Sequence, residues 1–244
     1  MDRKWIAMAT GACVLTAGLM AAAYARVPRI VDPIDPANFD APLDNPYYPL
    51  EVGQVSIMRG QEDGVRFHER IRVTADTKVI QGVATTVVLD KLWEDGRLAE
   101  RTRDWYAPDD EGTVWYFGEY TESIDDGQVV DTHGSWEAGV DGAVAGVIMP
   151  ADPRPTVAYR QEYFRGEAED QAWITQRFAE RTVPYGHLED LVRSFEWNRL
   201  EPRVVVQKFF APGLGLVYER VVAGGVESLE LVDFIPAGER QGNR

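Results

Sequence analysis

Apolar and polar side chains alternate in short runs along the chain from about residue 50 onward. The clearest run spans residues 65–74, where Val65, Phe67, Ile71 and Val73 alternate with Arg66, His68, Arg70 and Arg72. Because successive side chains of a strand point to opposite faces, this run predicts a strand with one face in a core and the other in water. The same reasoning predicts strands at about 79–93 with a break near 81–82, and at 98–107, 113–122, 128–137, 157–164, 172–178, 204–210, 214–223 and 226–235.

Residue pairs that are typical of tight turns separate these runs: Asp63-Gly64, Asp95-Gly96, Glu111-Gly112, Asp126-Gly127 and Gly224-Gly225. They predict consecutive hairpins, because such residues tolerate the positive φ angles of hairpin turns. One segment, 187–197, has apolar residues at helical spacing but also permits strand alternation. We therefore predict an all-β fold, mainly an antiparallel curved sheet or a partly open barrel, with at most one or two short helices near 187–197.

The N-terminus has the pattern of an export signal. Arg3 and Lys4 precede an apolar stretch, and Ala23 and Ala25 fit the small-x-small rule for cleavage after residue 25. An uncleaved membrane anchor is the alternative, since about 20 apolar residues can span a bilayer. We predict a signal peptide at 1–25, a proline-rich spacer at 26–46, a single β domain at 47–236 and a flexible C-terminal tail at 237–244, with no membrane span after cleavage.

Charge and cysteine content restrict the location and the partners. The only cysteine, Cys13, lies in the predicted signal peptide, so the mature chain would have no disulfide in an oxidising compartment. Acidic residues outnumber lysines and arginines, 40 to 25, and the formal net charge is −15. Such a charge disfavours nucleic acid as a partner. We predict a periplasmic or secreted protein whose oligomeric state is left open.

Aromatic residues and a long loop suggest a binding face. Residues 134–155 are rich in Gly and Pro and show no strand period, and long loops in compact domains are commonly functional. In the strand at 113–122, alternation places Glu119 on the side of Trp115 and Phe117. The leading hypothesis is a non-catalytic binding domain whose concave aromatic face takes an apolar or amphipathic small molecule, lined by Trp115, Phe117, Glu119, Trp136, Glu137, Ile148 and Met149. Structural pairing of Glu119 with Arg101, Arg103 or Arg160 is the alternative.

A Ca²⁺-stabilised interaction module is a second hypothesis, because acidic residues crowd the predicted turns. Ca²⁺ binds carboxylate and carbonyl oxygens in loops. The candidate ligands are Asp109, Asp110, Glu111 and Asp141, with Glu119 nearby. Solvated turn acids would give the same pattern, and the sequence has no loop with EF-hand spacing. No other cofactor is predicted.

A carboxylate-dependent hydrolase is the third hypothesis, in which Glu119 would act with Glu137 or Asp141. The sequence contains no nucleophile elbow, no Gly-rich phosphate loop and no closely spaced pair of histidines. We therefore expect binding rather than catalysis.

Several segments carry a resemblance to a family of exported bacterial β-rich proteins. They include Gly134-Ser135-Trp136-Glu137-Ala138-Gly139-Val140-Asp141-Gly142-Ala143, Val114-Trp115-Tyr116-Phe117-Gly118-Glu119 and Tyr159-Arg160-Gln161-Glu162-Tyr163, together with 45–50, 104–109, 148–151, 168–170 and 211–217. This resemblance implies export and a β-rich fold and implies no particular activity. More distantly, the hairpin at 211–217 is similar to those of periplasmic half-barrel proteins of the lipoprotein-carrier kind, which wrap a curved sheet around an apolar ligand.

Overall fold

The computed structural model describes residues 34–155 and 158–238. The predicted signal peptide, the first part of the predicted spacer and most of the predicted C-terminal tail lie outside the described residues. No helix of the described residues is long and apolar enough to cross a membrane.

Fifteen strands and one short 3-10 helix make up the described part of the chain. The helix is η1 (Pro36–Phe39). The strands are β1 (Val55–Glu62), β2 (Val65–Ile80), β3 (Val83–Glu94), β4 (Arg97–Pro108), β5 (Val114–Asp125), β6 (Gln128–Asp131), β7 (Trp136–Glu137), β8 (Val144–Met149), β9 (Tyr159–Arg160), β10 (Glu162–Tyr163), β11 (Asp170–Val183), β12 (Gly186–Asn198), β13 (Val205–Ala211), β14 (Gly215–Ala223) and β15 (Glu227–Ile235).

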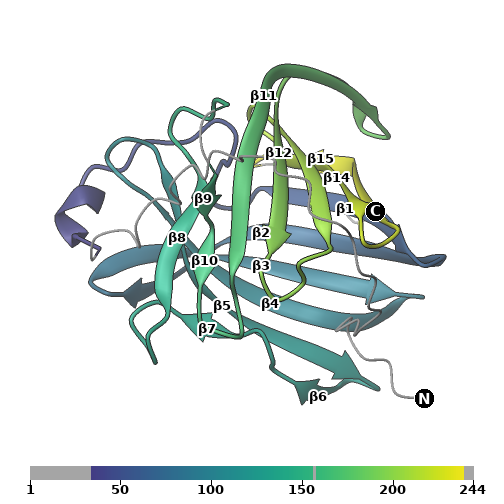
Figure 1. The fold of residues 1–244 in the computed structure, drawn as a ribbon, viewed down its shortest axis with the longest axis horizontal. Coiled ribbons are helices and arrows are strands. Elements are labelled where there is room, and N and C mark those ends of the chain that lie inside the picture. Colours follow the sequence, from purple (N-terminus) through teal and green to yellow (C-terminus); the bar gives the residue numbers. More distant parts are fainter. Residues whose placement is uncertain (1–33, 156–157, 239–244) are drawn as a thin grey trace, which may run out of the picture.

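All the strands belong to one antiparallel sheet. Its order is β10-β8-β5-β4-β3-β2-β1-β15-β14-β13-β12-β11-β9, and β6 and β7 each pair with β5 off this path. The sheet is so strongly curved that β2–β5 run crosswise to β11–β13 in Figure 1. The two ends of the path, β9 and β10, are separated along the chain by Gln161 alone, although they do not pair with each other. The predicted all-β, antiparallel curved sheet is confirmed.

The predicted hairpin turns are present where Asp-Gly pairs stand. Asp63, Asp95 and Asp126 have φ angles of 46°, 48° and 47°, and each is followed by a glycine with positive φ. The predicted break near residue 81 is also such a turn, since Gln81 has a φ of 48°. Turns of this kind match the right-handed twist of the strands that they connect.

The segment at 187–197, for which both a helix and a strand were left open, is strand β12. In the pairing of β11 with β12, Ala179 lies opposite Leu191 and Arg181 lies opposite Leu188. Two steps along β11 therefore correspond to three steps along β12, so β12 contains one extra residue here. This β-bulge brings Leu188 and Leu191 into one core cluster although they are three residues apart. A bulged strand therefore imitates the spacing of a helix, and the strand alternative was the right interpretation.

Two strands, β1 and β8, were missed because glycines interrupt their apolar alternation. In β1, Gly60 lies under the ring of Phe67, where any Cβ would clash. In β8, Gly146 lies against the backbone of Gln161 with the same result. Both glycines are required by close packing between chain segments rather than by turns.

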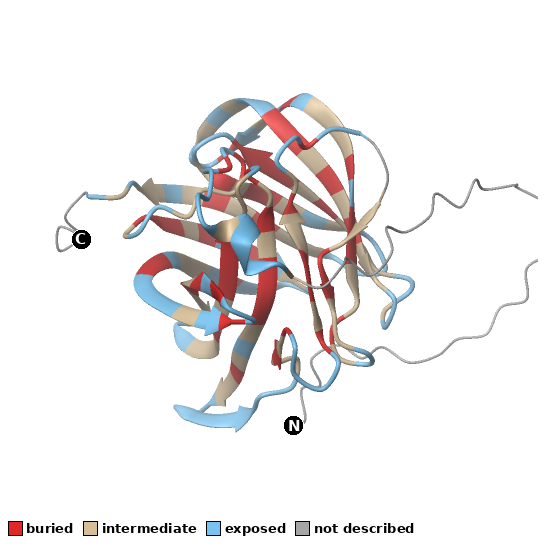
Figure 2. Cartoon of the chain, turned by 90° about the vertical axis from the view of Figure 1, so that its left-hand side faces the viewer, coloured by how far each residue is buried: buried red, intermediate tan, exposed pale blue. Residues whose placement is uncertain are grey.

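The buried residues form two clusters. The larger one joins β2–β5, β7 and β8 with single residues of β11–β13, and the smaller one joins the far half of the β11–β12 hairpin to β1, β2 and β13–β15. Figure 2 shows that the buried positions follow the strands, whereas the turns between them are exposed. Residues 34–46, the described part of the predicted spacer, pack on the domain: Phe39 meets Trp115 and Phe117 edge to face, and the Asn45 side chain donates to two backbone carbonyl groups.

Candidate functional site

An interior cavity lies where the curved sheet faces itself. One part has a volume of about 280 Å³ and is lined mainly by β1–β4, β13–β15 and the segment that precedes β1. An adjoining part of about 460 Å³ lies toward β5, β10 and β12. The two parts share five lining residues: Tyr106, Ile148, Gln161, Glu196 and Lys208. We call these two parts together the interior cavity.

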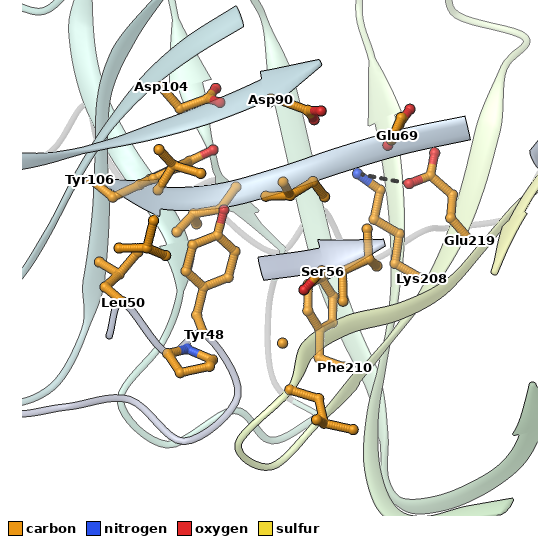
Figure 3. A pocket seen from close by; sticks show the side chains of 18 of the residues that line it. Tyr48, Leu50, Ser56, Glu69, Asp90, Asp104, Tyr106, Lys208, Phe210 and Glu219 are labelled. Carbon is orange, nitrogen blue, oxygen red and sulfur yellow. Dashed lines mark ion pairs between the residues drawn. The ribbon is translucent and has the colours of Figure 1, made fainter. Parts of the chain in front are cut away.

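Apolar and aromatic side chains line one portion of the interior cavity. Tyr48 and Leu50, from the segment before β1, lie near Tyr106 on one side of the cavity (Figure 3). The rings of Tyr48 and Tyr106 meet edge to face with centroids 5.1 Å apart. Further apolar lining comes from Ile71, Val73, Val88, Phe210, Leu214, Leu216 and Leu229. Such a surface suits the hydrocarbon part of a ligand.

Four carboxylates from four neighbouring strands form a row on the cavity side of the sheet. They are Glu69 of β2, Asp90 of β3, Asp104 of β4 and Glu119 of β5. Glu69 and Asp90 lie on neighbouring strands and are offset by two residues in the pairing register, and so are Asp90 and Asp104. Asp104 and Glu119 are paired directly opposite each other. We call these four residues the acidic row; Figure 3 shows three of them along one side of the cavity.

Enclosure by the fold makes ionisation of the acidic row unfavourable. Burial raises the pKa of Asp90 to about 8, and nearby Asp104 and Glu100 add to the effect. Burial also raises the pKa of Glu119 to about 8 and that of Glu69 well above its ordinary value. The pKa of Asp104 rises only to about 6, because the Tyr116 hydroxyl donates to its Oδ1 at 2.8 Å and so stabilises the charged form.

Lys208 is the one cation that lines the interior cavity among the described residues. Its Nζ lies 3.0 Å from Glu196 Oε2 and 3.4 Å from Glu219 Oε2. Burial opposes the charged form of Lys208, yet the two carboxylates outweigh burial and raise its pKa. Lys208 therefore forms its ion pairs with Glu196 and Glu219 and forms none with the acidic row.

Two of the predicted ligand-binding residues, Glu119 and Ile148, line the interior cavity. Trp115, Phe117 and Met149 do not. Phe117 and Met149 are fully buried, and Trp115 donates from Nε1 to Asp109 at 2.9 Å. Trp115 and Phe117 pack on Phe39 of η1.

The predicted placement of Glu119 beside Trp115 and Phe117 is wrong because β5 contains a β-bulge. Across from β4, the register moves from Gly118 directly to Tyr116, and Phe117 is the extra residue. An extra residue reverses the alternation beyond it. Glu119 therefore shares its face with Tyr116, and the cavity side lies opposite the face predicted from simple alternation.

Trp136 and Glu137, also predicted to bind the ligand, lie at a separate shallow depression that Glu119 also lines. Trp136 is buried and donates from Nε1 to Glu162 at 2.9 Å. Glu137 accepts from Lys78 Nζ at 2.7 Å, and that ammonium lies 3.5 Å from the centre of the Trp105 ring. These contacts give both residues structural partners. Glu119 has none of the predicted arginine partners among the described ion pairs.

The predicted calcium ligands do not converge. Asp109 accepts hydrogen bonds from the backbone of Glu111 and Thr113 and from the Trp115 ring, so it holds the β4–β5 turn together. Asp110 Oδ1 accepts from the backbone of Ala41. Asp141 occupies a turn with a φ of 49° in another loop. No three His, Cys, Asp or Glu side chains of the described residues are grouped to hold a metal ion.

The sequence reasoning missed Glu69, Asp90 and Lys208 as lining residues. A signal was present, since Glu69 stands between Phe67 and Ile71 on the apolar side of the best predicted strand. An acidic residue at an inward position of a core strand is unusual and points to a polar interior.

Comparisons with known proteins give limited similarity. No protein-family model matches the chain, and no curated protein sequence matches it significantly. Among solved structures, the chain is similar to a protein of Bacteroides fragilis described as exported and as having a YmcC-like fold, with 14% identity, a TM-score of 0.45, and coverage of 78% of this chain and 98% of that one. It is also similar to a protein of Parabacteroides distasonis described as a lipoprotein, with 9% identity, a TM-score of 0.42, and coverage of 79% and 100%.

Proposed function

We propose that the chain is an exported, non-catalytic binding domain that holds an amphipathic small molecule in the interior cavity. One observation carries this proposal: a cavity inside the sheet has apolar side chains along one portion and carboxylates along another. Ligand sites are typically concave and largely apolar, with a few polar groups that fix the orientation. The N-terminal pattern supports export.

The size of the interior cavity supports a ligand with a short alkyl chain. The part of about 460 Å³ falls in the range of small-molecule sites, and the part of about 280 Å³ is close to its lower limit. Apolar side chains from β2, β3, β13 and β14 would contact the hydrocarbon, and burial of that hydrocarbon would drive binding.

Displacement of a fluorescent apolar probe tests this proposal. N-phenyl-1-naphthylamine should bind the purified protein with enhanced fluorescence, and octanol should displace it. The variant Ile71→Phe places a larger side chain at the cavity wall and should weaken probe binding at least tenfold. The matched control is Ile57→Phe in β1, because Ile57 is also half-buried but does not line the interior cavity. Equal binding by both variants would place the probe elsewhere and overturn the proposal.

A second candidate function, acid–base hydrolysis, is favoured by the pair Asp104 and Glu119. The two residues are directly opposite each other on neighbouring strands, and Tyr116 donates to Asp104. With pKa values raised by burial to about 6 and about 8, one carboxylate would be ionised and the other protonated near neutral pH. A general acid and a general base require such a difference.

Hydrolysis of chromogenic esters and glycosides tests the second candidate. Activity should show a bell-shaped pH profile and disappear in both Asp104→Asn and Glu119→Gln, while Asp125→Asn on the exposed end of β5 should keep it. Activity that survives in both cavity variants would come from a contaminant or another site and would exclude this pair.

A further inference from the structure

We propose that the polar end of the ligand is an organic cation, such as a primary amine, which the acidic row of Glu69, Asp90, Asp104 and Glu119 receives. This inference rests on the proposed binding function and names the chemistry of the ligand. It follows from the charge that lines the cavity, from one unpartnered carboxylate oxygen and from the apolar residues interspersed with the row.

The described lining of the interior cavity is strongly acidic. Ten acidic side chains and one cation, Lys208, line its two parts: the four members of the acidic row with Glu162, Asp170, Glu196, Glu201, Glu219 and Glu227. An anionic ligand would find one cation, which already pairs with Glu196 and Glu219, whereas a bound cation would stabilise the ionised form of carboxyl groups that burial otherwise disfavours. The cavity therefore selects against carboxylates and phosphates.

Other carboxylates of low exposure in the protein form ion pairs with basic side chains. Glu122 lies 2.7 Å from Arg101 Nε and 3.0 Å from Arg103 NH1. Glu196 and Glu219 share Lys208. In contrast, the described residues contain no ion-pair partner for any member of the acidic row. No lysine, arginine or histidine of the described residues completes this pattern at the acidic row.

Asp90 provides the independent observation. Its side chain is half-buried and lines the interior cavity, yet its Oδ1 atom is buried and has no hydrogen-bond partner among the described residues. Buried polar atoms are normally hydrogen-bonded, so an exception of this kind needs an explanation. An ammonium group in the cavity would donate to this oxygen, and Asp104 on the next strand would accept a second hydrogen bond.

The pattern of the strands gives the shape of the ligand. Ile71 and Val73 follow Glu69 on the cavity side of β2, and Val88 precedes Asp90 on the same side of β3. Asp90 and Asp104 are diagonal neighbours on adjacent strands, with Cα atoms about 7 Å apart. An ammonium between their carboxylates therefore leaves an attached alkyl chain in contact with these apolar residues. A single-chain alkylamine satisfies both portions of the lining.

Three ligands of equal chain length test this inference: octylamine, octanol and octanoate, titrated calorimetrically into the purified protein at neutral pH. We expect octylamine to bind at least tenfold more tightly than octanol, and octanoate to bind more weakly than octanol. Asp90→Asn and Asp104→Asn should each lower the affinity for octylamine about tenfold and leave octanol unchanged. Asp125→Asn, the same change at an exposed position of β5, is the matched control.

The outcomes separate this inference from the proposed function. If the three ligands bind equally, the cavity takes amphiphiles without preference for a cation, and only this inference is overturned. If none of them binds or displaces the apolar probe, the proposed function fails and the inference fails with it. The comparison of ligands in the unmodified protein decides the matter even if a cavity variant does not fold.

Discussion

The two faces of the same four strands, β2 to β5, carry different ionisable groups: carboxyl groups on one face and mainly cations on the other. The cavity side holds the acidic row, in which burial raises every pKa. The other side holds a cross-strand line of cations that ends on one acid: Arg70, Lys91, Arg101 and Glu122. There Glu122 meets two arginines, and its pKa is lowered by their hydrogen bonds. We call this side the outer face.

The difference shows that net charge says little about where charge is placed. A chain with a net charge of −15 places Arg70, Arg101 and Arg103 on the outer face and leaves the acidic row without ion-pair partners among the described residues. The charges of the outer face do not lower stability, because they are exposed to solvent or, like Glu122, form ion pairs. On the cavity side, the carboxylates without partners lower the stability of the fold, and such residues are common at functional sites.

Removal of the one cation of the cavity should have the largest effect. Lys208→Met leaves Glu196 and Glu219 enclosed without their partner, so we expect a loss of about 3 kcal/mol in the free energy of unfolding at pH 8. Urea denaturation measures it. Lys91→Met on the outer face should change stability by about 0.5 kcal/mol or less. Equal losses in the two variants would mean that the two faces do not differ in the way described.

Loss of the tyrosine hydroxyl beside the acidic row should have the next largest effect. Tyr116→Phe removes the 2.8 Å hydrogen bond to Asp104 Oδ1, and hydrogen bonds to buried charged groups contribute about 2 kcal/mol. Because this bond favours the ionised form, the pKa of Asp104 should rise in the variant. Chemical denaturation and carboxylate titration by NMR measure the two effects. Tyr120→Phe at an exposed position of β5 is the control, and a comparable loss there would contradict the role given to Tyr116.

Much of the fold could be predicted from the sequence, because alternation and Asp-Gly turns are local signals. They gave the positions of β2–β5 and of β13–β15 to within about three residues, except that β2 continues to Ile80, six residues beyond its predicted end. The errors have one physical origin. The β-bulges at Phe117 and in β12 shift the alternation, and the glycines of β1 and β8 interrupt it, and both features depend on contacts with other segments.

Little of the candidate site could be predicted, because its residues come together only through the curvature of the sheet. Glu119 was singled out, but its neighbours were wrong by one residue of register. Glu69 and Lys208 are far apart in the chain and line one cavity only because β1, β15 and β14 carry the sheet around from β2 to β13. Sequence patterns indicate which side of a strand is buried, but they do not indicate which other strands pack against that side.

Replacement of an enclosed carboxylate by its neutral analogue should increase stability at high pH. The pKa of Asp90 is about 8 in the folded chain and about 4 in an unfolded one, so the folded state binds the extra proton between these values. Stability therefore falls as the pH rises through this window. Asp90→Asn should be more stable than the unmodified protein by at least about 1 kcal/mol at pH 8.5, and this gain should vanish near pH 4. Denaturant midpoints at both pH values measure the change, and a constant difference would contradict it.

The same kind of substitution on the outer face should act in the opposite direction and with the smallest effect. Because Arg101 and Arg103 lower the pKa of Glu122, the folded state binds fewer protons there than the unfolded chain. The stabilisation is present above the unfolded pKa of about 4.3 and is lost as the pH falls through the lower folded value. Glu122→Gln should therefore destabilise by about 0.5 kcal/mol at pH 7 and by nothing measurable near pH 2. The contrary outcome is that Glu122→Gln stabilises the protein as the pH rises, as expected for Asp90→Asn. In that case the paired and the unpaired carboxylates would not differ in their effect on stability.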